Sequence, residues 1–351
     1  MARRSSPLAV LGMAVVALGG CADDAPPVTA TRVVDVSGLR EIVNAVGLAP
    51  DGGLVAVADA DGNLTMYDLP AGAVRWKVRV HAAGAAHRID AVGFSPDGTL
   101  VATAGDGSRT VALWEAAGGR AAGLVAVPGV RALAFHPTDR VLAVAAHATV
   151  SIVDLATAEV TRALPNAHQG DAVYAVAFSA DGRALATASA HGSLKLWHWP
   201  ALTLRASVAM APALEALTPV ALALSATGTR AALNGILGRV HVVDTVRERE
   251  ERTFANAPAA PGHDRHGEMR HALAFAADEH WLLAPDVHDR GLRVVHVPSG
   301  RSHGAIRGGA PFYKAVAIAT SATWVALLHP GDGQGQGPYG LEVWRLAYGA
   351  K

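Results

Sequence analysis

Apolar and polar residues alternate in short runs along most of this chain, and turn-forming residues separate the runs. The stretch Phe94–Glu115, FSPDGTLVATAGDGSRTVALWE, shows the pattern most plainly. Its apolar runs are separated by Pro-Asp-Gly and Gly-Asp-Gly, which supply the backbone angles of tight turns. The period is near two residues rather than 3.6, so the pattern predicts three short β-strands. A similar stretch recurs at Phe178–Trp199.

The same unit recurs seven times between Val43 and Leu346. In each copy an apolar strand ends just before a turn, and these strand ends lie 41–51 residues apart. The strand ends are Leu48, Phe94, Phe135, Phe178, Leu224, Phe275 and Ile318. A later strand of each copy carries a second marker, in the order Tyr67, Trp114, Val153, Trp197, Val243, Val295 and Trp344. Repeats of this length built from short strands are typical of propeller blades, which bury their faces against one another.

The sequence therefore predicts an all-β, seven-bladed β-propeller over residues 32–348. Only seven residues follow Trp344, too few for the outer strand of the last blade. The segment Thr31–Gly38 has strand character but no blade of its own. We predict that Arg32–Val36 completes the seventh blade and closes the ring, which leaves no free edge where the chain ends meet.

The fourth copy, HQGDAVYAVAFSADGRALATASAHGSLKLW, resembles a complete WD repeat, and the first two copies resemble partial ones. The resemblance to the WD-repeat family covers Val43 to Leu346 and weakens in the fifth to seventh copies. In that family a His, a Ser or Thr, an Asp and a Trp form a hydrogen-bonded network in each blade. The resemblance assigns His168, Ser189 and Trp197 to the network, with His191 where the Asp is expected. Related Tol-type and lactonase-type propellers stay open as alternatives.

The resemblance also indicates where partners bind. In WD-repeat proteins, residues near the start of each innermost strand surround the top of the central channel and contact partners. The corresponding candidate rim here consists of Arg88, Asp90, Arg131, Tyr174, His271, Phe312 and Lys314. Arg and Tyr are enriched among the residues that dominate binding energy at interfaces. Arg131 and Tyr174 hold equivalent positions in successive copies, so we expect them to be neighbours around the channel.

The single cysteine, Cys21, follows a segment that is typical of a secretory signal. Arg3 and Arg4 precede an apolar stretch that is shorter than the roughly 20 residues of a membrane span. The tetrapeptide Leu-Gly-Gly-Cys at 18–21 resembles the lipobox of bacterial lipoproteins, whose Cys is acylated, for example with palmitate. We predict a signal peptide at 1–20, lipidation of Cys21 and a tether at 21–31. The alternative is a plain secretory signal with an unmodified Cys.

The lipobox resemblance implies an extracytoplasmic, lipid-anchored protein, and Ala22 after the cysteine favours the outer membrane, facing the periplasm or the cell surface.

Composition agrees with a folded protein, because 51% of the residues are hydrophobic. Lys and Arg number 30, as do Asp and Glu, so no net charge attracts nucleic acid. One Cys rules out an intramolecular disulfide and a cysteine-based zinc site.

Motifs for catalysis are missing from the sequence, which has no G-x-S-x-G, H-E-x-x-H or P-loop pattern. One candidate metal site is the stretch HDRHGEMRH, because imidazole and thioether groups suit copper. Its candidate ligands are His263, His266, Met269 and His271. A solvated loop between the fifth and sixth blades is the alternative, and we predict no cofactor or metal.

Two hypotheses for function follow. The first is a non-catalytic, membrane-tethered scaffold that binds a protein or peptide on the channel-top face. The alternative is a propeller enzyme or a binder of a small ligand or metal, lactonase-like or quinone-cofactor-like, that uses the central funnel. That alternative needs several carboxylate or imidazole groups facing the channel, and only Asp90 and His271 of the rim are of these types.

Overall fold

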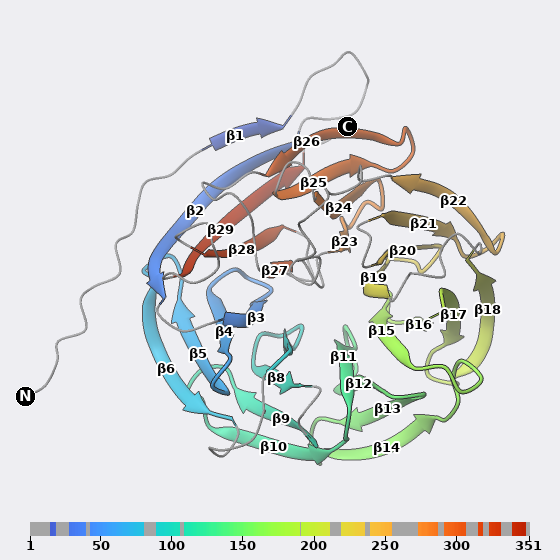
Figure 1. Ribbon diagram of the computed structural model, residues 1–351, viewed down its shortest axis with the longest axis horizontal. Helices are drawn as coiled ribbons and strands as arrows, with labels where there is room; N and C mark the ends of the chain where they lie inside the picture. Colours follow the sequence, from blue (N-terminus) through green and yellow to red (C-terminus); the bar gives the residue numbers. More distant parts are fainter. Residues whose placement is uncertain are drawn as a thin grey trace, which may run out of the picture.

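The protein was analysed as a computed structural model, in which every described secondary-structure element is a β-strand. The described residues are 15–18, 28–39, 43–80, 89–105, 109–189, 191–210, 219–235, 239–254, 273–286, 291–306, 315–318, 323–330 and 339–348. Seven antiparallel sheets stand around a common centre like the blades of a propeller (Figure 1). The predicted all-β, seven-bladed β-propeller is confirmed. The described residues contain no helix that could span a membrane.

Blades 1 to 3 each consist of four consecutive strands, ordered from the centre of the ring outwards (Figure 1). Blade 1 contains β3 (Val43–Leu48), β4 (Leu54–Asp59), β5 (Asn63–Asp68) and β6 (Ala73–Arg79). Blade 2 contains β7 (Ala91–Phe94), β8 (Leu100–Ala104), β9 (Thr110–Glu115) and β10 (Ala121–Ala126). Blade 3 contains β11 (Val130–Phe135), β12 (Val141–Ala146), β13 (Thr149–Asp154) and β14 (Glu159–Leu164).

Blades 4 to 6 follow the same plan. Blade 4 contains β15 (Val173–Phe178), β16 (Ala184–Ser189), β17 (Ser193–His198) and β18 (Thr203–Ala209). Blade 5 contains β19 (Pro219–Leu224), β20 (Arg230–Gly235), β21 (Val240–Asp244) and β22 (Arg249–Phe254). Blade 6 contains β23 (Ala274–Phe275), β24 (Trp281–Asp286), β25 (Gly291–His296) and β26 (Arg301–Ile306).

Blade 7 joins the two ends of the chain. It contains β27 (Ala315–Ile318), β28 (Trp324–Pro330) and β29 (Tyr339–Tyr348), and its fourth strand from the centre is β2 (Val28–Leu39), with β1 (Val15–Leu18) paired outside β2. β2 pairs antiparallel with β29 from Val28 opposite Tyr348 to Leu39 opposite Tyr339. The prediction that Arg32–Val36 closes the ring is therefore confirmed. The strand is longer than predicted and begins at Val28, inside the segment 21–31 expected to be a tether, because Val28 and Ala30 are fully buried.

The Ser-x-Asp-Gly sequence explains why the turn after the innermost strand recurs. In blade 4, the Ser179 hydroxyl donates to Asp181 Oδ1 at 2.6 Å and accepts the backbone N–H of Ala184 at 3.0 Å. The same carboxylate oxygen accepts the N–H of Arg183 at 3.0 Å. Gly182 takes a φ of +70°, which favours glycine. The turn therefore needs a short hydroxyl, a carboxylate and a glycine at fixed spacing.

Apolar side chains fill the spaces between neighbouring blades, and tryptophans contribute at several of them. Trp281 of blade 6 is 1% exposed and packs with Val316 of blade 7. Trp324 of blade 7 packs with Leu48 and Val55 of blade 1. The ring of Trp199 lies 5.1 Å from the ring of His136 in blade 3. Trp199, Trp281 and Trp324 therefore pack between blades.

A recurring hydrogen bond also connects some outer strands to the next blade. Trp76 in β6 donates from Nε1 to the carbonyl oxygen of Ala116 at 2.8 Å. At the equivalent position of β22, Arg252 donates to the carbonyl oxygen of Pro298 at 2.7 Å. Arg162 in β14 donates likewise to the carbonyl oxygen of Pro200. These donors stabilise the junction between blades from the perimeter of the ring.

Candidate interaction site at the inner rim

The inner rim is the set of residues at the start of the innermost strands. The structure describes three of the predicted rim residues. Asp90 directly precedes β7, Arg131 is the second residue of β11, and Tyr174 is the second residue of β15. All three are half-buried. Arg88, His271, Phe312 and Lys314 lie outside the described residues.

Arg131 and Tyr174 are in contact across the junction of blades 3 and 4. The guanidinium carbon of Arg131 lies 5.2 Å from the centre of the Tyr174 ring, within the range of a cation–π interaction. The prediction that these two residues are neighbours is confirmed. The stacking holds the two long side chains in one arrangement, so a partner loses less side-chain entropy when it binds them.

The loop before β15 leads into the strand that carries Tyr174. It contains three residues with positive φ: Asn166 (51°), Gln169 (58°) and Gly170 (100°). Backbone hydrogen bonds tie it to the neighbouring β12–β13 turn, with Ala167 N donating to Ala148 O at 3.1 Å. Lys195 Nζ donates to the carbonyl oxygen of Ala167 at 2.8 Å. This loop is therefore fixed at several points.

Polar side chains extend the rim outwards over blades 3 and 4. The exposed His147 sits in the turn between β12 and β13, and its imidazole packs against Gly129, where an added Cβ would lie 2.3 Å from Nε2. In blade 4, Asp171 Oδ1 lies 3.0 Å from Nδ1 of His191, at the end of the blade that carries Tyr174. Sequence reasoning did not select His147, because only the pairing of β12 with β11 brings its turn beside Arg131.

The hydrogen-bonded network of blade 4 differs from the prediction in its hydroxyl group. Nε2 of His168 lies 2.8 Å from the hydroxyl of Thr187, which also accepts the indole N–H of Trp197 at 3.0 Å. Thr187 therefore takes the place predicted for Ser189, because Ser189 lies two residues further along β16, away from Trp197.

The network of blade 4 also lacks the family's Asp, as the sequence indicates. Nδ1 of His168 contacts the hydroxyl of Ser193 at 3.2 Å. His191, which stands where the family's Asp is expected, pairs instead with Asp171. Its side chain is 73% exposed, so it lies on the surface outside this network.

The buried network predicts a pH dependence of stability. His168 is 3% exposed, and burial, with a contribution from Lys195, lowers the pKa of His168 to about 4. The unfolded chain binds this proton below pH 6.5, so the stabilisation is complete above pH 6.5 and is lost as the pH falls towards 4. Between pH 8 and pH 5 this corresponds to a loss of about 2 kcal/mol.

Urea unfolding of the wild type and of His168→Gln at both pH values measures this loss. The stability advantage of the wild type should shrink by about 2 kcal/mol at pH 5. His191→Gln is the matched control, because that imidazole is exposed, and its difference from wild type should change little. An advantage of equal size at pH 8 and pH 5 would show that His168 does not titrate as described.

Among the described residues, no group of three or more His, Cys, Asp or Glu side chains is placed to hold a metal ion. His280, His296 and His303 of blade 6 gather around Trp281, where the rings of His296 and His303 lie 5.9 Å apart. The candidate metal loop with His263, His266, Met269 and His271 lies outside the described residues, as does Cys21.

Two parts of the chain are similar to a known protein family. The family model "WD domain, G-beta repeat" matches residues 78–115 and 159–198. No curated protein matches the chain. The second match runs from the outer strand β14 of blade 3 through β15, β16 and β17 of blade 4. Each sequence repeat thus begins with the outer strand of one blade and continues with the three inner strands of the next. In the same way, the first repeat consists of β2 of blade 7 followed by β3, β4 and β5 of blade 1.

Six blades of four strands and a seventh of five, built from a repeat that begins in the fourth strand of the preceding blade, define a β-propeller that the N-terminal strand β2 closes. Together with the two repeat matches, this arrangement supports a β-propeller of the WD-repeat type. Propellers of this family commonly bind other proteins.

Proposed function

We propose that this protein is a non-catalytic scaffold, held at a membrane by a lipid on Cys21, that binds a protein or peptide partner at its inner rim. The observation that carries the proposal is the stacked pair of Arg131 and Tyr174. The pair offers a planar cation and a phenol from two different blades. Such residues dominate binding energy at many interfaces, and a guanidinium pairs with the carboxylates of acidic partners.

The chemistry of the described rim supports binding more than catalysis. Among the described residues of the rim and its extension, the acid or base types are Asp90 of blade 2, His147 of blade 3, and Asp171 paired with His191 in blade 4. A general acid and base would need to converge on one point near a nucleophile or metal. The proposed role therefore includes no reaction and no cofactor, and the balanced charge of the chain favours protein over nucleic acid as the partner.

The proposed anchor rests on the sequence of the first 31 residues. Cys21 is the single cysteine of the chain and occupies the position that a lipobox requires. Acyl chains contribute about 0.8 kcal/mol for each buried CH₂ group, and stable anchoring takes more than one chain. The proposed location is extracytoplasmic, on the outer membrane of a bacterium, facing the periplasm or the cell surface.

Replacing Arg131 and Tyr174 together by alanine tests the rim. We expect the double variant to weaken partner capture at least roughly tenfold, about 1.4 kcal/mol, because the stacked pair is lost from a rigid site. The measurement is affinity purification of the tagged protein from native membranes, with quantitative mass spectrometry of the enriched protein. The melting temperature of the variant should stay close to that of the wild type.

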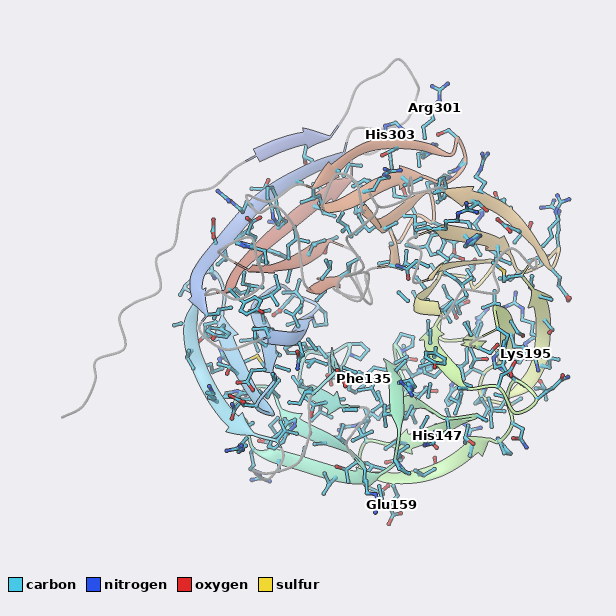
Figure 2. The ribbon with its side chains drawn as sticks, in the orientation of Figure 1. Phe135, His147, Glu159, Lys195, Arg301 and His303 are labelled. Atoms are coloured by element: carbon cyan, nitrogen blue, oxygen red, sulfur yellow. The ribbon has the colours of Figure 1, made fainter. Side chains whose placement is uncertain are left out.

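The matched control lies on the perimeter, where Glu159→Ala with Arg301→Ala removes two outward-pointing charges (Figure 2). Arg162 is unsuitable as a control because it bridges blades 3 and 4 through Pro200 and Trp199. Equal loss of the partner in both double variants would place the binding surface on the perimeter. Loss of a metal or small molecule on changing Asp90 and His271 would favour the alternative, an enzyme or ligand-binding propeller.

A further inference from the structure

The outer edge of β2 carries an added strand. Blade 7 has five strands in the order β1-β2-β29-β28-β27, whereas the other six sheets have four in the part of the chain that the structure describes. β1 (Val15–Leu18) pairs antiparallel with β2, with Val15 opposite Thr31 and Leu18 opposite Val28. β1 also lies close to β26 on the outside of the ring (Figure 1).

The paired half of β2 is held in an extended conformation by the rest of the molecule. Val28 and Ala30 are 0% exposed and pack in a core with Trp281 of blade 6. On its inner side β2 pairs with β29 along its whole length. Because this backbone is already ordered, strand addition at its outer edge carries a small entropic cost for the acceptor.

The side chains of this edge do little to prevent pairing. Proteins commonly protect an edge strand with charged residues or proline. Residues 28–31 read Val-Thr-Ala-Thr, and Thr29 and Thr31 are only half-buried. By contrast, β14 and β26 present Glu159 and Arg301 on the perimeter (Figure 2).

A second outer strand, β10, is also uncharged and serves as a comparison. It reads Ala-Ala-Gly-Leu-Val-Ala, and its Leu124 is 65% exposed. β10 ends its sheet, and among the described residues no strand pairs with its outer edge. Lack of charge alone therefore does not identify the site. The edge of β2 differs from the edge of β10 because a strand, β1, is paired with it.

Removal of the signal peptide would open the edge of β2. β1 belongs to residues 1–20, so this inference rests on the proposed function. Cleavage before Cys21 takes away Val15–Leu18 and leaves Val28 seven residues after the lipid-bearing cysteine. Seven residues reach at most about 25 Å, so the open edge lies near the membrane surface.

We propose that residues Val28–Thr31 of the processed protein form a strand-addition site for an extended, uncharged segment of a second protein at the same membrane. β1 itself indicates the chemistry of that segment, because Val-Val-Ala-Leu has no charge and is rich in residues that favour strands. Main-chain hydrogen bonds supply the affinity, as in other complexes that extend a sheet.

The probe for this site is a fluorescent peptide of residues 13–20, MAVVALGG, with two lysines appended for solubility. We expect it to bind the processed protein extracted from membranes in detergent. Two further peptides carry N-methyl groups on alternate residues. Strand pairing uses one edge of the peptide, so one of the two should bind as before and the other at least tenfold more weakly. Equal binding of both would overturn the proposal.

Protein variants locate the site. Thr29→Lys with Thr31→Lys is expected to weaken peptide binding about tenfold, because charged side chains on an edge oppose pairing. Leu124→Lys in β10 is the matched control and should leave binding unchanged. Loss of binding in the control alone would move the site to β10. A processed protein that is dimeric by light scattering would assign the edge to a second copy and overturn the proposed partner.

The uncut chain separates failure of this inference from failure of the proposed anchor. Cys21→Ser removes the thiol required for lipidation, so this variant should keep residues 1–20. Its β1 is then present at high local concentration and competes with the peptide for the edge of β2. We therefore expect no peptide binding. If intact-mass measurement shows that the wild type also keeps residues 1–20, the anchor is wrong. Ala17→Pro in that uncut chain displaces β1, and failure of the peptide to bind there overturns the strand-addition site as well.

Discussion

Deleting residues 1–36, with a fresh signal supplied, is expected to abolish the cooperative folding of the ring. The deletion removes most of β2, including the buried Val28, Ala30 and Val34, and uncovers the edge of β29. Trp344 and Leu341 of β29 are fully buried, and the deletion removes the apolar residues of β2 from their core clusters. The expected loss exceeds about 5 kcal/mol, which is comparable to the whole stability of many domains. Calorimetry or urea unfolding measures it.

A shorter deletion provides the control for this experiment. Removing residues 1–27 takes away β1 but leaves the pairing of β2 with β29 intact. This protein should melt within a few degrees of the full chain, because an edge strand of four residues adds few buried contacts. If the deletion of residues 1–36 melts at the same temperature as the deletion of residues 1–27, β2 does not hold the ring closed.

The blades could be predicted from the sequence because their cause is local. A turn such as SADG forms through contacts within five residues, and the alternation of apolar and polar positions follows the pleat of each strand. Closure of the ring could also be predicted, because the last copy lacks one strand and the first is preceded by one. The start of β2 was placed four residues late, since Thr29 and Ala30 follow a Pro-containing polar stretch.

The details of the candidate site depend on contacts between distant residues. The contact between Arg131 and Tyr174 could be predicted, because the two residues hold equivalent positions in successive repeats. The hydroxyl of the blade 4 network was misassigned, because Thr187 and Ser189 lie on the same face of β16 and sequence spacing cannot separate them. His147 was missed because its own segment carries no sign that Gly129 lies beneath it.

A buried charged cluster in blade 7 shows a further feature that the repeat does not predict. Glu342 of β29 has a side chain only 2% exposed, and its Oε2 accepts the indole N–H of Trp344 at 3.1 Å. Its Oε1 lies 3.7 Å from Arg32 of β2 and 3.8 Å from His329 of β28. The carboxylate of β29 therefore contacts both neighbouring strands, β28 and β2, and β2 is contributed by the other end of the chain.

Replacing Glu342 by alanine is expected to lower the free energy of unfolding by about 3 kcal/mol, because it leaves the half-buried guanidinium of Arg32 and the buried indole N–H of Trp344 without their acceptor. Arg32 keeps its 3.0 Å contact with Asp35, which places the cost at the low end for a buried ion pair. Glu342→Gln keeps an acceptor for Trp344 and should cost less. The control is Asp68→Ala, which breaks an exposed pair with Arg75 and should cost less than about 1 kcal/mol. Urea unfolding compares the three variants with the wild type. A Glu342→Ala protein no less stable than Asp68→Ala would show that the charged cluster does not help β2 to close the ring.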